Sequence, residues 1–459
     1  MKRNNSGNVD IFRVKKIYES VDKTKDMKKS INLKDLFLLV PFLLIPIFGS
    51  LALGFILSVA ICLSFYFIIK GRDYTPKSFK TIGVIFISYF TYYAVQGFFY
   101  TSNFSQHLHD LGKIFPILVI GILALLLKPN TFKISYKMLS FVAVLSIYLT
   151  TVLALIFRFF PPDIIILGQS FAQKTGVLGR LEMGTGNALP FGTIFISFAF
   201  LTCLGYERKS ILEKIISFSA LILAILIVGF WNGSRGPLLV IIPLAFLMFW
   251  YLFKNSKSEQ SLHPLILGVT VVALLAMSFI IMLNFGHITS INMVNGIKEL
   301  AYSGSSTSEY TEISSGSFVS THDKSVNIRL TIYRAGFEAF FAKPVFGFGI
   351  GNLSDSIIQF LPKTFHFGES HLHNILLNHM VAGGLVGLLF LFMLATSPLL
   401  VLWQKRDIIS INGVYLSFLI VFTIFGAGMS NVLFFHDLLA GFFSVLILVA
   451  SIASNEHGN

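Results

Sequence analysis

Long apolar segments recur along this chain and are separated by shorter polar ones. A helix needs about 20 apolar residues to cross roughly 30 Å of hydrocarbon, and most of the apolar segments are close to that length. The pattern predicts an all-α polytopic membrane protein with about twelve transmembrane helices. The predicted spans are 35–49, 51–69, 81–99, 111–127, 137–157, 187–204, 215–231, 236–253, 264–284, 374–395, 412–433 and 437–453.

Basic residues concentrate in the N-terminal tail and in the polar segments that follow every second span. The chain has 35 Lys and Arg against 22 Asp and Glu. An excess of this kind can indicate nucleic-acid binding, but its alternating placement is the positive-inside pattern of a membrane protein. We therefore expect both termini in the cytoplasm, contact with membrane lipids, and no nucleic acid partner.

This orientation divides the chain into four parts. Residues 1–34 form a cytoplasmic basic tail, which either is solvated or lies on an anionic leaflet, and 35–284 hold helices 1 to 9. Residues 285–373 form an external loop with a mobile Ser, Thr and Gly-rich middle at 303–317, and 374–459 hold helices 10 to 12. Within the loop, 325–341 has apolar residues at helical spacing and predicts an external helix. These residues are Ile328, Ile332, Ala335 and Ala339.

Composition supports the membrane assignment, since 54% of residues are hydrophobic and only 12% are charged. A water-soluble fold could not cover itself at that composition. The two cysteines, Cys62 and Cys203, lie within apolar segments and predict no disulfide framework.

Arg235 is the first candidate for chemistry, in the polar stretch 231–237 between two apolar spans. An ionisable residue at the membrane boundary is costly unless it reaches water or an anion. The planar guanidinium suits phosphate oxygens. The alternative is that Arg235 only extends its side chain to lipid headgroups.

His373 is the second candidate, directly before the predicted tenth helix. The helix dipole and neighbouring arginines disfavour its protonation, which leaves an imidazole able to accept a proton near pH 7. The alternative is an ordinary interfacial polar residue. His371 is two residues away, and a helix would not direct both side chains at one ion, so we expect no metal site.

Two further segments are weaker candidates. Residues 343–351 carry glycines at alternate positions and are expected to turn the backbone back toward the membrane. Arg180 lies in an external stretch, where it either pairs with Glu182 or helps to line an anion site.

Four short motifs, in this order and spacing, resemble the O-antigen ligase and polymerase superfamily. They are Ser234-Arg235-Gly236; Asn327-Ile328-Arg329 with Tyr333; Pro344 with Gly347, Gly349 and Gly351; and His373-Asn374 with Leu377, Gly384 and Gly387.

The resemblance implies a membrane-embedded, inverting, GT-C-like glycosyltransferase that uses an undecaprenyl-diphosphate-linked glycan donor, with no metal and no cofactor. By family analogy, His373 is the catalytic base or orients the acceptor, while Arg235 and Arg329 bind the diphosphate. Further substrate-binding positions are expected at Arg180, Arg334, His371 and Asn374. The expected location is the bacterial inner membrane, with the active site on the periplasmic side.

The acceptor is lipid A-core in the ligase branch and another lipid-linked glycan in the polymerase branch. We favour the ligase because the His-Leu-His-Asn run before a glycine-marked helix is more similar to that branch. A ligase that modifies protein acceptors shares the motifs. A twelve-helix secondary transporter is the alternative from another class, disfavoured because the two halves look unalike and the charged candidates gather at the external boundary.

Overall fold

The computed structural model describes most of the chain from residue 33 to residue 455. The described residues are those in this range other than 71–74, 101–102, 129–130, 160–164, 167–168, 171–187, 233–234, 256–323, 364–370, 405–409 and 430–432. The basic tail up to residue 32, the predicted span 264–284, the Ser-rich segment 303–317 and Arg180 lie outside them.

Helices occupy all the other predicted spans, so the all-α membrane architecture is confirmed. Eight described helices are long and apolar enough to cross a membrane, and three shorter apolar helices accompany them. The described helices are α2 (Leu33–Phe48), α3 (Ser50–Lys70), α4 (Lys77–Tyr100), α5 (Phe104–Leu126), α6 (Tyr136–Phe159), α7 (Ala188–Leu201), α8 (Ile211–Leu226), α9 (Arg235–Asn255), α12 (Lys324–Ala342), α13 (Leu353–Ile358), α14 (Ile375–Gln404), α15 (Ile411–Gly428) and α16 (Asp437–Asn455).

Extended structure is minimal in the described part of the chain. Two strands of two residues each, β1 (Ile165–Ile166) and β2 (Gln169–Ser170), pair antiparallel in the segment between α6 and α7. Short 3-10 turns occur at η3 (Tyr206–Arg208), η6 (Ile350–Asn352) and η8 (Leu433–Phe435), and a π-helical turn, η4 (Ile227–Asn232), follows α8.

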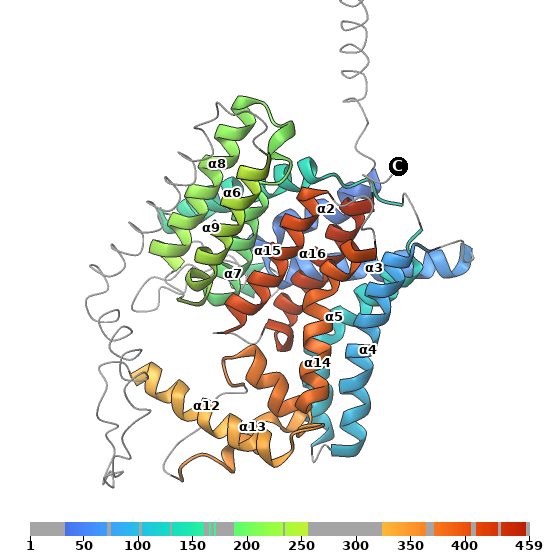
Figure 1. The fold of residues 1–459 in the computed structure, drawn as a ribbon, viewed down its shortest axis with the longest axis vertical. Coiled ribbons are helices and arrows are strands. Elements are labelled where there is room, and N and C mark those ends of the chain that lie inside the picture. Colours follow the sequence, from blue (N-terminus) through green and yellow to red (C-terminus); the bar gives the residue numbers. More distant parts are fainter. Residues whose placement is uncertain are drawn as a thin grey trace, which may run out of the picture.

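Helix α16 lies at the centre of the bundle (Figure 1). Of its spanning window, 89% is buried, against 33–61% for the other seven long helices. Its Phe442 ring stacks on Phe42 of α2 at 5.7 Å and lies 6.0 Å from Phe198 of α7. A helix apolar on all sides is buried in this way, so α16 forms the core around which the other helices pack.

Helix α15 connects the two ends of the bundle. At its start, Asn412 donates from Nδ2 to Glu207 Oε1 at 2.9 Å. At its other end, Gly428 packs closely against Ile375 at the start of α14. We name these the Lys209 end, after the neighbouring buried lysine, and the α12 end, where Figure 1 shows α12 and α13 in the lower part of the molecule.

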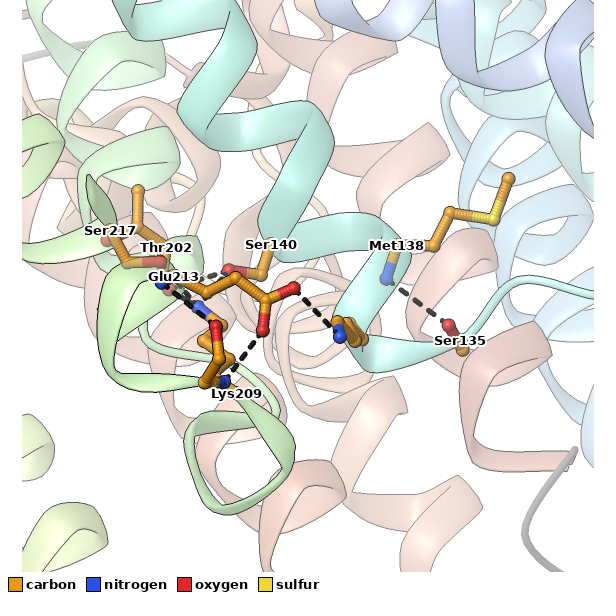
Figure 2. A network of polar contacts seen from close by, with 9 residues as sticks. Ser135, Met138, Ser140, Thr202, Lys209, Glu213 and Ser217 are labelled. Atoms are coloured by element: carbon orange, nitrogen blue, oxygen red, sulfur yellow. Dashed lines mark hydrogen bonds and ion pairs between the residues drawn. The ribbon is translucent and has the colours of Figure 1, made fainter. Parts of the chain in front are cut away.

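A buried lysine joins three helices at the Lys209 end (Figure 2). Lys209 Nζ donates to Ser140 Oγ of α6 at 2.6 Å and to Ser217 Oγ of α8 at 2.7 Å, and also to the carbonyl oxygen of Thr202 after α7. Burial lowers the pKa of Lys209 to about 8. All three contacts are to neutral acceptors, so this lysine acts as a hydrogen-bonding crosslink between α6, α7 and α8.

Helix α14 is broken one third of the way along. Gly384 has φ 61° and ψ −155°, which divides the element into a short arm, Ile375–Gly383, and a long arm, Leu385–Gln404. The predicted span 374–395 is confirmed as a long apolar helix, but the helix is interrupted at Gly384 and continues to Gln404. The long arm runs beside α4, and Gln404 Nε2 donates to Thr81 Oγ1 at 2.8 Å near the far end.

Residues 344–349, which we name the strap, supply the backbone partners that the break removes. Two N–H groups at the start of the long arm donate to strap carbonyls, and two strap N–H groups donate to carbonyls at the end of the short arm. These bonds are Leu385 N to Pro344 O (2.8 Å), Val386 N to Val345 O (3.2 Å), Phe348 N to Val381 O (2.9 Å) and Gly349 N to Ala382 O (2.9 Å).

Two side chains of α4 complete this set. Tyr92 OH donates to Gly383 O at 2.6 Å and to Phe346 O at 3.3 Å. Gln96 Nε2 donates to Ala382 O at 2.7 Å and also to Phe346 O. The backbone oxygens at the break are therefore satisfied by a neighbouring helix, as irregular backbone at membrane depth requires.

The glycine-rich segment turns the chain at the strap, as predicted. Close packing of the strap against the short arm requires a glycine at position 347. Gly347 has φ 70°, and a Cβ there would lie 2.6 Å from the Ala382 carbonyl. A larger residue would separate the strap from the short arm.

Replacing Gly384 by alanine should destabilise the protein strongly. The left-handed φ disfavours an L side chain, and the added Cβ would lie 2.3 Å from Val345 O. We expect a loss of more than about 2 kcal/mol, measured as a lower melting temperature in detergent. Gly54→Ala in α3 is the matched control, because a Cβ there meets nothing within 4 Å. Equal melting temperatures for the two variants would contradict this account of the break.

Candidate functional site

The predicted histidine lies in a strained turn at the start of α14. His373 has φ 53°, and no other non-glycine residue in the described ranges has a positive φ. Asn374 follows it and caps the helix, since its Oδ1 accepts from Leu377 N at 3.1 Å. Strained backbone of this kind is held in place by its surroundings and is enriched at functional sites.

Polar contacts from two elements hold this turn. Asn378, fully buried one helical turn later, accepts from Leu372 N at 3.0 Å through Oδ1 and donates from Nδ2 to Asn374 O at 2.7 Å. Tyr333 OH on α12 lies 3.2 Å from His373 O. The turn is therefore fixed from both α12 and α14.

His371 and His373 face each other, with ring centroids 4.4 Å apart and planes at 67°. The turn precedes α14, and its backbone brings together two side chains that a helix would direct apart. Burial lowers the pKa of His371 to about 3, assisted by His373, Lys113 and His436. His371 is therefore neutral at pH 7, and its low proton affinity makes it a weak base.

Two other helices contribute charge to the surroundings of His371. On α5, Lys113 Nζ pairs with Asp110 Oδ1 at 2.6 Å. Before α16, His436 Nδ1 lies 3.2 Å from Asp437 Oδ1. Sequence reasoning missed this group, because each pair resembles ordinary polar residues at a helix end. Only the packing of α5 and α16 brings them to the start of α14.

The helix predicted at 325–341 is confirmed as α12, and its placement outside the membrane stays a prediction. Ile332, Ala335 and Ala339 form its buried face. Arg329 is half-buried one turn before Tyr333, and its charge opposes the rise in the pKa of Tyr333 that burial causes. Arg329 is thus brought to the His373 turn through the tyrosine that contacts it.

Arg334, on the exposed side of α12, forms an ion pair with Glu338 at 3.0 Å, and 68% of its side chain is exposed. Its assignment as a substrate-binding residue remains a prediction.

Arg235 begins α9, directly after the π-helical turn and two undescribed residues. Its side chain is outside the described part of the structure, but its backbone lies at the α12 end. Val240, in the second turn of α9, packs against Gly426 of α15. Beyond Gly426, the carbonyl oxygen of Met429 lies 3.4 Å from Tyr333 OH. The start of α9 and the His373 turn therefore flank the same end of α15.

No group of three or more His, Cys, Asp or Glu residues within the described ranges is arranged to hold a metal ion.

The comparison with known families concerns the part of the chain that carries this site. Residues 219–392 match the model of the O-antigen ligase family. This part of the chain is similar to the O-antigen ligase family, which supports the resemblance that the sequence motifs carry. The family match implies a membrane glycosyltransferase-like enzyme acting on lipid-linked glycans. No curated protein matches the chain in sequence.

The matched region includes most of the site described above. Arg235, Arg329 and the turn 371–374 lie within it, as do the strap and the break in α14. Lys113 and His436 lie outside it, and so does Arg180. The family match therefore covers the histidine turn and its supports, while α5 and α16 add charged residues from beyond it.

Acid should destabilise the protein through His371. Its pKa is about 3 when folded, against about 6.5 in an unfolded chain, so between these values the unfolded state binds a proton that the folded state does not. The stability that neutral His371 contributes is fully present above pH 6.5 and is lost as the pH drops toward 3. We expect the melting temperature in detergent to decline over this window, and His371→Gln to reduce the decline. His109 is exposed, and the control variant His109→Gln should show the same decline as the wild type. If His371→Gln also shows the wild-type decline, His371 is not its cause.

Proposed function

We propose that this protein is an O-antigen ligase, which transfers an undecaprenyl-diphosphate-linked glycan to lipid A-core at the periplasmic face of the bacterial inner membrane. One observation carries the proposal: a buried turn with two facing histidines, supported from α12 and α14, lies within the region that matches the O-antigen ligase family. The proposed topology places both termini in the cytoplasm and the α12 end in the periplasm, in agreement with the positive-inside pattern.

In the proposed reaction, an acceptor hydroxyl attacks the anomeric carbon of the donor sugar. The new glycosidic bond forms as the bond to the diphosphate oxygen breaks, on opposite faces of the ring, so the anomeric configuration inverts. A neutral imidazole of the His371–His373 pair takes the hydroxyl proton. We assign this role to His373, which matches the essential histidine of the family by analogy. His371, with a pKa of about 3, is a weak base.

The leaving diphosphate gains negative charge as the bond breaks, and preorganised cations stabilise that charge. Arg329 and Arg235 are the proposed diphosphate ligands, since guanidinium groups donate two parallel hydrogen bonds to phosphate oxygens. These cations can supply the charge that a divalent metal supplies in other transferases. Arg180 and Arg334 are proposed as helpers; Arg334 would have to exchange Glu338 for substrate.

Asn374 has a structural role that its assignment as a substrate ligand did not include. Its Oδ1 caps α14, and its Nδ2 lies 4.0 Å from Met429 Sδ. We propose that Asn374 acts mainly by fixing the turn that presents His373.

A deletion strain tests the function directly. Without a ligase, long polymer should remain lipid-linked and lipid A-core should stay bare; without a polymerase, single repeats would cap the core. We expect wild-type protein to restore capped core and His373→Asn to fail while remaining folded, because asparagine tolerates the left-handed backbone and lacks the imidazole. The exposed His109→Ala is the matched control. Capped core with His373→Asn would exclude His373 as the base.

Arg235→Lys should also abolish transfer in that strain. A lysine keeps the positive charge and loses the planar pair of donors. Arg208→Lys, at an exposed position of the Lys209 end, is the control and should transfer normally. Wild-type levels of capped core with Arg235→Lys would show that Arg235 serves only as a lipid anchor.

A further inference from the structure

The strap exposes apolar side chains, although it belongs to a loop that the sequence placed wholly outside the membrane. Val345 and Phe346 are each 49% exposed, and Phe341 in the last turn of α12 is 72% exposed. On α4, which contacts the strap through Gln96, Phe98 and Phe99 are 75% and 76% exposed. A cluster of this kind is unfavourable in water and indicates a covering partner or a membrane.

Contacts to α4 set the depth of the strap. The far end of the α4 and α14 pair is marked by exposed Lys80 and by Thr81, which is bonded to Gln404. Gln96, which donates to Phe346 O, lies about 22 Å further along α4 at 1.5 Å per residue. The hydrocarbon core is about 30 Å thick, so the strap lies at the depth of the leaflet on the α12 side.

The exposed side chains of the strap continue the apolar surface of a membrane-spanning helix. Val345 is paired through its backbone with the start of the long arm of α14. There Leu385 is 54% exposed and Leu389, one turn further, is 58% exposed. No polar side chain separates the two in the long arm, because 385–395 is apolar throughout.

The backbone of the strap is suited to lipid. Irregular backbone at membrane depth is tolerated only where its polar groups are satisfied. The carbonyl oxygens of Pro344, Val345 and Phe346 all accept hydrogen bonds from α14 or from side chains of α4. Gln96, a polar residue only 3% exposed, makes one of these contacts, to Phe346 O, and also donates to Ala382 O of the short arm. Protein donors thus take the place that water would occupy in an aqueous loop.

A lysine bounds this apolar surface at the junction of α12 and the strap. Lys343 Nζ lies 4.5 Å from the ring centroid of Phe348 and 5.8 Å from that of Tyr100. A long basic side chain lying over aromatic rings and reaching for the headgroup level is typical of a membrane interface.

We propose that the strap and the last turn of α12 are immersed in the leaflet on the α12 side, with lipid acyl chains covering Phe341, Val345 and Phe346. The segment 344–349 is then a re-entrant element of the membrane domain, although it belongs to the long loop. The inference rests on packing and depth and is independent of the proposed transferase activity.

Site-specific fluorescence tests the proposal. In a Cys62→Ser, Cys203→Ser background, single cysteines replace Phe346 or Phe341 and carry the polarity-sensitive dye NBD. The full-length protein is reconstituted in phosphatidylcholine and phosphatidylglycerol vesicles, with or without bromine on the acyl chains near the headgroup. We expect blue-shifted emission at both positions and loss of most of the intensity in brominated vesicles.

Two reference positions calibrate the result. Leu389→Cys, on the lipid-facing long arm, should be quenched; Lys363→Cys, exposed in a turn after α13, should emit as in water and resist bromine. If the Phe346→Cys protein does not fold and reconstitute into the vesicles, the emission from Phe341→Cys decides the test. Emission at the test positions like that of Lys363 would overturn the proposal. Blue-shifted emission that bromine does not quench would also overturn it, because a protein surface and not lipid would then cover the strap.

Discussion

The hydrogen bonds that the strap makes at Gly384 are the interaction on which the rest of the site depends. A break in a membrane helix exposes N–H and C=O groups that lipid cannot satisfy. Here the strap pairs with both arms of α14, and Tyr92 and Gln96 pair with what remains. The short arm is thereby fixed at an angle to the long arm, and the turn that carries His373 is fixed with it.

This arrangement explains why distant motifs act as one unit. Helix α12, the strap and α14 are consecutive along the chain except for the α13 segment, and each contacts the next. Tyr333 connects α12 to the His373 turn and to the end of α15, while α15 packs against α9 near Arg235. A catalytic group needs a rigid support more than it needs a long helix. The break in α14 allows its short arm to support the polar His373 turn, while its long arm forms an apolar membrane span.

Much of this could be read from residue patterns. The spans and the helix at 325–341 follow from apolar runs and helical periodicity, because burial in lipid imposes composition directly on sequence. Short motifs identified His373 as a candidate. The break at Gly384 could not be read in the same way. The run from Leu376 to Leu402 is almost uniformly apolar, and a glycine within it is compatible with a continuous helix. The conformation of Gly384 depends on Val345, which lies 39 positions earlier in the sequence.

The sequence by itself determined that this is a membrane protein and approximately which segments span the membrane. It also determined which arginines and histidines were candidates for chemistry. Those features depend on local composition. Tertiary structure alone decided that His371 faces His373, that Lys113 and His436 surround them, and that a glycine-rich strap closes a broken helix. Each of these is a contact between segments far apart in the chain, and the hydrogen bonds and charges that create it have no counterpart in the local pattern.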